Sequence, residues 1–249
     1  MPIPHIEPIQ WAFAAIAALC IGLSKAGFGG VAMVSILLMT QVLPARESTG
    51  AILPMLILAD VFAVAAYHKH ADHRLVLRLM IPAVVGIVCG WLLMPHIPAE
   101  GFGQVIGWLT LALIVLVLLQ KFAPGLIQLA GESRGVAWPF GWLAGVTTML
   151  ANAAGPVMAI YLLACRLPKM AFVGTSAWFF FAVNITKVPF SANLGLINAS
   201  SLSLNLCLAP AVIGGLYFGR WLLGKVSQKA FEWLMIGFSL IGALRLALG

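Results

Sequence analysis

The sequence predicts an all-α membrane protein with two inverted repeats, each made of one broken, re-entrant helical hairpin and three transmembrane helices. Three observations predict it. The chain of 249 residues is 62% hydrophobic and only 8% charged, with a mean hydropathy of +1.06. It contains about eight apolar segments, and short stretches of its first half recur in its second half. A soluble domain needs roughly a quarter of its residues charged, so this chain belongs in lipid.

Two of the apolar segments are too long for one spanning helix, which needs about 20 residues. The first is broken by the glycine-rich stretch from Gly22 to Gly30, and the fifth by the stretch from Asn152 to Pro156. Glycine, proline and polar groups interrupt helices, so we expect a hairpin in each segment, with arms of about 12 to 14 residues. The apolar segments lie at about residues 11–43, 50–67, 76–94, 103–120, 138–165, 172–190, 203–223 and 231–248.

The basic residues favour this topology because Lys and Arg are enriched in cytoplasmic loops. If both hairpins are re-entrant, ten of the 14 basic residues share one face, and both termini lie on the other face. If all segments span the membrane, the basic residues are divided between the two faces and their bias toward one face largely disappears. The ten are Lys69, Arg74, Arg78, Lys121, Arg134, Arg166, Lys169, Arg220, Lys225 and Lys229. They are scattered singly and form no basic surface for nucleic acid.

The recurring stretches divide the chain into a membrane repeat at 1–125 and a second at 136–249, which together form one integrated transmembrane domain. Pro82–Gly86 reads PAVVG and Pro210–Gly214 reads PAVIG, and the Trp-Leu-Leu at Trp91 returns at Trp221. Three crossings in the first repeat place the second copy upside down. Inverted repeats with interrupted helices at matching positions are typical of secondary transporters, which bind their substrate near the midplane.

Three charged residues fall inside apolar segments, namely Lys25, Asp60 and Lys187. Charge at this depth is costly and usually marks a transport pathway. The repeat aligns Asn184 with Asp60, and two lysines against one aspartate favour an anion over a cation. Glycines and polar groups at a hairpin tip can also bind an anion. We therefore predict substrate binding by Ser24, Lys25, Gly27, Gly29, Gly30, Asn152, Gly155, Thr175, Ser176, Asn184 and Lys187.

Several alternatives stay open at this point. The glycines could serve only close helix packing, and Lys187 could extend to the membrane surface. Asp60 could pair with Lys25 or Lys187, or couple transport to a proton. We interpret the four cysteines as small buried apolar residues, and the histidines of the loop at 68–73 as solvated. Catalytic, nucleotide-binding and metal motifs are missing from the sequence, so we expect no enzyme, cofactor or metal.

The stretch Gly22–Gly30, and Gly174–Phe180 followed by Asn184 and Lys187, resemble the sulfite exporter TauE/SafE family. The resemblance covers nearly the whole chain and includes its length and duplication. It implies a multi-pass permease of the bacterial inner membrane that exports sulfite, a sulfonate or a similar anion. Export of an anion from a cell that is negative inside is favourable without ATP. Two alternatives to this function stay open: transport of another small anion such as a carboxylate, and a non-transporting membrane subunit. The protein could also form a homodimer.

Overall fold

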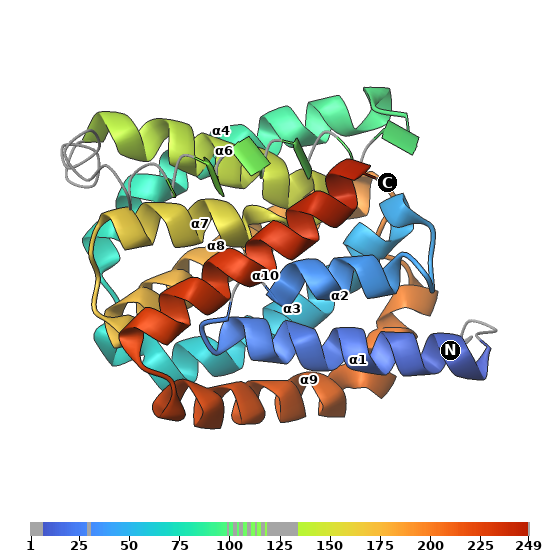
Figure 1. The fold of residues 1–249 in the computed structure, drawn as a ribbon. Coiled ribbons are helices and arrows are strands. Elements are labelled where there is room, and N and C mark those ends of the chain that lie inside the picture. Colours follow the sequence, from blue (N-terminus) through green and yellow to red (C-terminus); the bar gives the residue numbers. More distant parts are fainter. Residues whose placement is uncertain are drawn as a thin grey trace.

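The computed structural model describes residues 7–28, 31–98 and 134–248, together with single helical positions between 100 and 118. These described parts contain helices and no strand, as the sequence predicts, and the predicted segment at 103–120 falls mostly outside them. The helices are α1 (Pro8–Lys25), α2 (Val31–Met39), α3 (Ala45–Tyr67), α4 (His73–Leu93), α6 (Arg134–Ala151), α7 (Ala154–Ala164), α8 (Lys169–Asn193), α9 (Ala199–Lys225) and α10 (Gln228–Leu248), with short 3-10 turns η1 (His68–His70) and η2 (Met94–His96) (Figure 1).

Five of the described helices are long and apolar enough to cross a membrane: α1, α3, α4, α8 and α9. Their outer faces carry large apolar side chains. Leu77 of α4 and Leu206 of α9 are 70% and 73% exposed, which suits contact with lipid tails and not with water. The chain therefore has the helices of a multi-pass membrane protein.

Both predicted breaks are present. Helix α1 ends at Lys25 and α2 begins at Val31, and the connection includes Gly27 at φ +116°. Helix α6 ends at Ala151 and α7 begins at Ala154, and the connection includes Asn152 at φ +54°. Positive φ is accessible to glycine and is tolerated by asparagine better than by most residues. These two residues therefore turn the chain where a helix stops.

The second arm of each broken segment returns toward the start of the first arm. In the first segment, the Gln10 side chain donates a hydrogen bond of 3.3 Å to the Gln41 carbonyl. In the second, the rings of Phe140 and Tyr161 lie 5.6 Å apart. Each broken segment is thus a hairpin whose two ends lie on the same side of the molecule, although its placement against the bilayer stays a prediction.

The predicted arm lengths are wrong. Helices α1 and α6 have 18 residues each, whereas α2 has 9 and α7 has 11. The first arms are longer because helix continues into the more polar residues before each apolar segment. At Glu7 a reciprocal hydrogen-bond pair with Gln10 caps the start of α1, one residue before Pro8. An arm of this length reaches roughly 27 Å, so each hairpin has one long and one short arm.

The long arm of each hairpin packs on a long helix of the other half of the chain: α1 on α9, and α6 on α4 (Figure 1). Glycines permit the approach. A Cβ atom on Gly215 would lie 2.1 Å from the Leu19 carbonyl oxygen, and one on Gly145 would lie 2.1 Å from the Ala83 carbonyl oxygen. Small residues at such crossings let two backbones touch, which is how helices associate in lipid. Here the glycines do serve helix packing, at positions away from the predicted site.

The two long arms run in opposite directions. In both helix pairs, a glycine further along one helix contacts residues further along the other helix. Helix α1 is therefore parallel to α9, and α6 is parallel to α4. Helix α4 is parallel to α8, because His73 contacts Trp178 near their starts and Trp91 contacts Phe190 near their ends. Helix α8 is antiparallel to α9, because Lys169 at its start bonds two carbonyls at the end of α9. Hence α1, which is parallel to α9, is antiparallel to α6.

The prediction that the cysteines are buried is wrong for Cys207, which is exposed on α9, while Cys20, Cys89 and Cys165 are partly buried. An apolar thiol on an outer helix face meets lipid instead of water, so its burial inside the protein is not required. None of the four forms a disulfide in the described structure.

Candidate functional site

Three charged side chains are buried together at the centre of the bundle. Lys25 lies at the end of α1, Asp60 in the second half of α3, and Lys187 in the second half of α8. They are 9%, 0% and 2% exposed, and they are the buried charged residues of the described chain. Charges this deep are tolerated only when other groups compensate them, so their partners define what the site can do.

Lys25 is paired with Asp60. Its Nζ lies 2.8 Å from Asp60 Oδ1, and the same Nζ lies 4.4 Å from the centre of the Phe180 ring. The ring face adds a favourable cation–π contact to the ion pair. Of the partners that the sequence left open for Asp60, the structure selects Lys25.

Asp60 also contacts Asn184, the residue that the sequence alignment of the two halves places opposite it. The Asn184 side chain donates a hydrogen bond of 2.7 Å from Nδ2 to Asp60 Oδ2. The two residues come from α3 and α8, which run antiparallel, because Gly174 near the start of α8 lies against Tyr67 at the end of α3. Asp60 therefore uses one oxygen for the ion pair with Lys25 and the other for the hydrogen bond from Asn184.

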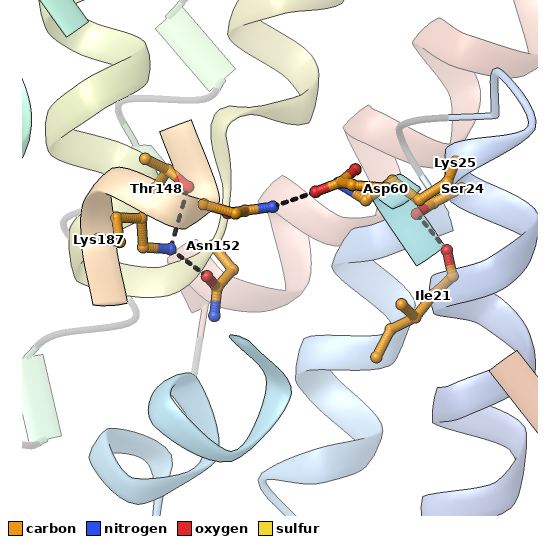
Figure 2. Close-up of polar contacts among 8 residues, drawn as sticks. Ile21, Ser24, Lys25, Asp60, Thr148, Asn152 and Lys187 are labelled. Atoms are coloured by element: carbon orange, nitrogen blue, oxygen red, sulfur yellow. Dashed lines mark hydrogen bonds and ion pairs between the residues drawn. The ribbon is translucent and has the colours of Figure 1, made fainter. Parts of the chain in front are cut away.

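Lys187 is held by neutral groups of the second hairpin. Its Nζ donates to Thr148 Oγ1 at 3.2 Å and to Asn152 Oδ1 (Figure 2). Asn152 is itself fixed, because its Nδ2 donates to the Thr49 carbonyl at 2.9 Å. The alternative in which Lys187 extends to the membrane surface is wrong, since the side chain points inward to the second break.

Two narrow cavities adjoin this cluster, and both are bounded by Ser24, Lys25, Gly155 and Phe180. Because Ser24 and Lys25 come from the first hairpin and Gly155 from the second, the two breaks meet at a common space. The first cavity continues along α7 and α8, where it is lined by Gly27, Met158, Ala159, Phe172, Ser176 and Ala177. The second continues toward α3 and α6, where it is lined by Ala32, Leu56, Thr148, Asn152 and Asn184.

Most of the predicted binding residues come together here. Those that line a cavity are Ser24, Lys25, Gly27, Asn152, Gly155, Ser176 and Asn184, and Asp60 and Lys187 bond to lining residues. Ser24 is oriented by a hydrogen bond of 2.7 Å from its Oγ to the Ile21 carbonyl (Figure 2). The predicted residues Gly29 and Gly30 lie outside the described residues.

Thr175 is not part of this cluster. Its Oγ1 accepts a hydrogen bond of 2.9 Å from the backbone N–H of Asp72, in the loop between α3 and α4. The Asp72 carboxylate in turn accepts from the backbone N–H groups of Arg74 and Leu75 and so caps α4. Thr175 and Asp72 therefore stabilise this loop, and a side chain at position 175 points away from the site although its neighbour Ser176 lines it. The histidines of the loop form no group of three metal ligands with the other described residues.

Sequence reasoning missed Phe180 and Thr148. Phe180 covers Lys25, and Thr148 accepts a hydrogen bond from Lys187. Phe180 lies four residues before the predicted site residue Asn184 on α8. Residues four apart share a helix face, so this spacing could have found Phe180. Thr148 lies four residues before Asn152, but Asn152 follows the end of α6, so a helical spacing does not relate the two.

The cluster is suited to a small anion. Two ammonium groups and one carboxylate leave it positive, and the adjoining Ser176 hydroxyl and Asn152 amide groups offer neutral hydrogen-bond donors. Apolar side chains form the rest of the walls and keep the local dielectric constant low, which strengthens attraction to an anion.

Comparison with known proteins agrees with this chemistry. The family model described as "Sulfite exporter TauE/SafE" matches residues 14–246 of the 249-residue chain. No curated protein and no solved structure matches the chain significantly. The match includes both hairpins and every described residue of the buried cluster.

Proposed function

Because the chain belongs to the sulfite exporter TauE/SafE family of membrane transporters for sulfur-containing anions, we propose that it is a secondary exporter in the bacterial inner membrane. Its substrate is a small sulfur-containing anion such as sulfite or a sulfonate, bound between the two hairpin tips. The observation that carries this proposal is that two oppositely directed breaks share cavities next to two buried lysines.

The helix contacts support an inverted repeat around this site. If α1 corresponds to α6 and α4 to α9, the contact of α1 with α9 is the counterpart of the contact of α6 with α4. The contacts of α3 with α9 and of α8 with α4 form a second matching pair. Helices α3 and α8 cross at Asp60 and Asn184, on the axis that would relate the halves. Transporters of this architecture rock one half against the other around a fixed midplane site.

Binding in this site draws on both hairpins. Lys25, Ser24 and Gly27 contribute from the first tip. Gly29 and Gly30, which lie outside the described residues, stay proposed binding residues. Asn152 and Gly155 contribute from the second tip, with Ser176 and Asn184 from α8 and with Lys187 behind Asn152.

Asp60 competes with the substrate for the Lys25 ammonium group. Its carboxylate holds Lys25 at 2.8 Å, in the way that a bound anion would. A proton on Asp60 removes that attraction and raises the positive charge of the cluster by one unit, so protonation changes how strongly the site holds an anion. Asp60 is therefore the proposed coupling residue through which a proton is linked to anion movement.

The membrane potential provides the driving force for export. Moving one negative charge out of a cell that is negative inside gains about 2.3 kcal/mol per 100 mV. A secondary exporter for an anion therefore needs no nucleotide.

Flux measurements in proteoliposomes test this function. Vesicles loaded with sulfite, methanesulfonate or acetate are compared with empty-lipid vesicles, and we expect protein-dependent efflux of the two sulfur anions. A Lys187→Gln variant should reduce this efflux by at least about 30-fold, because a buried charged donor is lost. The matched control is Lys69→Gln, which removes an exposed lysine in η1 and should leave efflux unchanged.

Two outcomes would contradict the proposal. Efflux of acetate alone would favour the alternative of a carboxylate transporter. Efflux no faster than from empty-lipid vesicles, with folded protein present, would favour the alternative of a non-transporting membrane subunit.

A further inference from the structure

We infer that, while Asp60 is ionised, the site selects its substrate by charge and carries a monoanion, because the buried cluster then has one uncompensated positive charge, on Lys187. The inference rests on the proposed function and goes beyond it by stating the charge class of the substrate. It depends on four contacts of the described residues and on the burial of the groups that make them.

The first step is that Lys25 is already compensated. Its Nζ is 2.8 Å from Asp60 Oδ1, and Asp60 is fully buried. The second oxygen of Asp60 accepts from Asn184 Nδ2 at 2.7 Å. Asp60 therefore makes its ion pair with Lys25.

The second step is that Lys187 has only neutral partners. Its two hydrogen bonds go to Thr148 Oγ1 and Asn152 Oδ1, and within the described chain no carboxylate oxygen lies within ion-pair distance of it. An ammonium group has three donors, so one is left over. At 2% exposure, water cannot screen this charge.

The third step is that the partners of Lys187 face a cavity. Thr148 and Asn152 line the same cavity as Lys25 and Asn184. An anion placed there lies beside the lysine that has no counter-charge and near the Phe180 ring that covers the other lysine. One negative charge makes the buried cluster neutral as a whole.

A dianion in the same place leaves one negative charge uncompensated in a space with mostly apolar walls. Placing one charge at bilayer depth disfavours binding by about 100-fold, equal to about 2.8 kcal/mol at 1.4 kcal/mol per factor of ten. The site should therefore discriminate between anions of the same shape that differ in charge.

Methanesulfonate and sulfate are the probes that isolate charge. Both are tetrahedral sulfur oxyanions of similar size, but the first carries one negative charge and the second carries two. Exchange into proteoliposomes is measured at zero membrane potential, so that the potential does not favour the dianion. We expect the wild-type protein to exchange methanesulfonate about 100-fold faster than sulfate at equal concentration.

Charge variants test the cause of the selectivity. Asp60→Asn leaves Lys25 without its counter-charge and gives the cluster two excess positive charges, so the ratio of methanesulfonate to sulfate exchange should fall by about 100-fold. Lys187→Gln removes the excess charge and should abolish exchange of methanesulfonate.

The results separate this inference from the proposed function. Equal exchange of methanesulfonate and sulfate by the wild-type protein would overturn the monoanion inference and leave sulfur-anion transport intact. No exchange of either anion, and no efflux of sulfite, would overturn the proposed function itself. If Asp60→Asn does not fold, the ratio of methanesulfonate to sulfate exchange by the wild-type protein still tests the monoanion inference.

Discussion

The two halves of the buried centre share a scaffold but differ in charge. In the first half the hairpin contributes Lys25 and the long helix α3 contributes Asp60, and the two form an ion pair. In the second half the hairpin contributes Asn152, and the long helix α8 contributes Asn184 and Lys187. The first lysine thus lies on a hairpin and has a carboxylate, whereas the second lies on a long helix and has neutral partners.

This difference separates what holds the fold from what binds the anion. Features that recur in both halves, such as the glycine crossings and the broken helices, position the two tips. Features that do not recur, above all the two lysines at unrelated positions, give the centre its charge. The two buried lysines should therefore have unequal effects on stability although both belong to the proposed site.

The largest expected difference concerns the stability of two matched variants, Lys25→Gln and Lys187→Gln. Lys25→Gln leaves the Asp60 carboxylate fully buried without a cation, which should lower the free energy of unfolding by about 3–5 kcal/mol. Lys187→Gln leaves no buried charge unpaired, and its amide can still donate to Asn152, so the loss should be about 1 kcal/mol. Unfolding of the purified protein in detergent measures both.

A double variant identifies the cause of the Lys25 effect. Lys25→Gln combined with Asp60→Asn removes the whole ion pair and should recover most of the stability that Lys25→Gln loses. Equal destabilisation by Lys25→Gln and Lys187→Gln, or no recovery in the double variant, would break the contrast between the two lysines.

A smaller effect is expected for the glycines that the halves share. Gly215→Ala and Gly145→Ala each place a Cβ 2.1 Å from a backbone oxygen, so each should destabilise the protein by about 1–3 kcal/mol. Gly214→Ala is the matched control, because its Cβ would meet only the Leu19 side chain at 3.9 Å. Thermal unfolding compares the three. A large loss of stability in only one of Gly215→Ala and Gly145→Ala would show that the two helix crossings are less alike than their contacts indicate.

Local signals were enough to predict the breaks and the charged cluster. Glycine, asparagine and proline inside an apolar segment interrupt a helix whatever surrounds them, so Gly27 and Asn152 could be anticipated as turning points. Lys25, Asp60 and Lys187 could be anticipated as a cluster because isolated charges are too costly in lipid. The alignment of Asp60 with Asn184 predicted a common depth, and the two side chains are in contact.

The remaining features depend on tertiary contacts. The predicted first arms were too short because apolar composition does not mark where a helix starts when polar caps extend it, as at Glu7. Thr175 was assigned to the site as a neutral hydrogen-bond donor, but it and its neighbour Ser176 point in different directions on the helix. Which lysine pairs with Asp60 depends on the directions of α1, α3 and α8, and single-sequence patterns carry no information on that choice.

The central claim is that the two hairpins enter from opposite faces and return to the face from which they came. Labelling of single cysteines with a membrane-impermeant thiol reagent tests it directly, in a variant without the four native cysteines. Exposed positions Glu7 and Gln41 mark the ends of the first hairpin, and Arg166 marks the end of the second. We predict that Glu7→Cys and Gln41→Cys react from the outer face and that Arg166→Cys reacts from the cytoplasmic face. Reaction of Glu7→Cys and Gln41→Cys from different faces, or of Gln41→Cys and Arg166→Cys from the same face, would contradict the account.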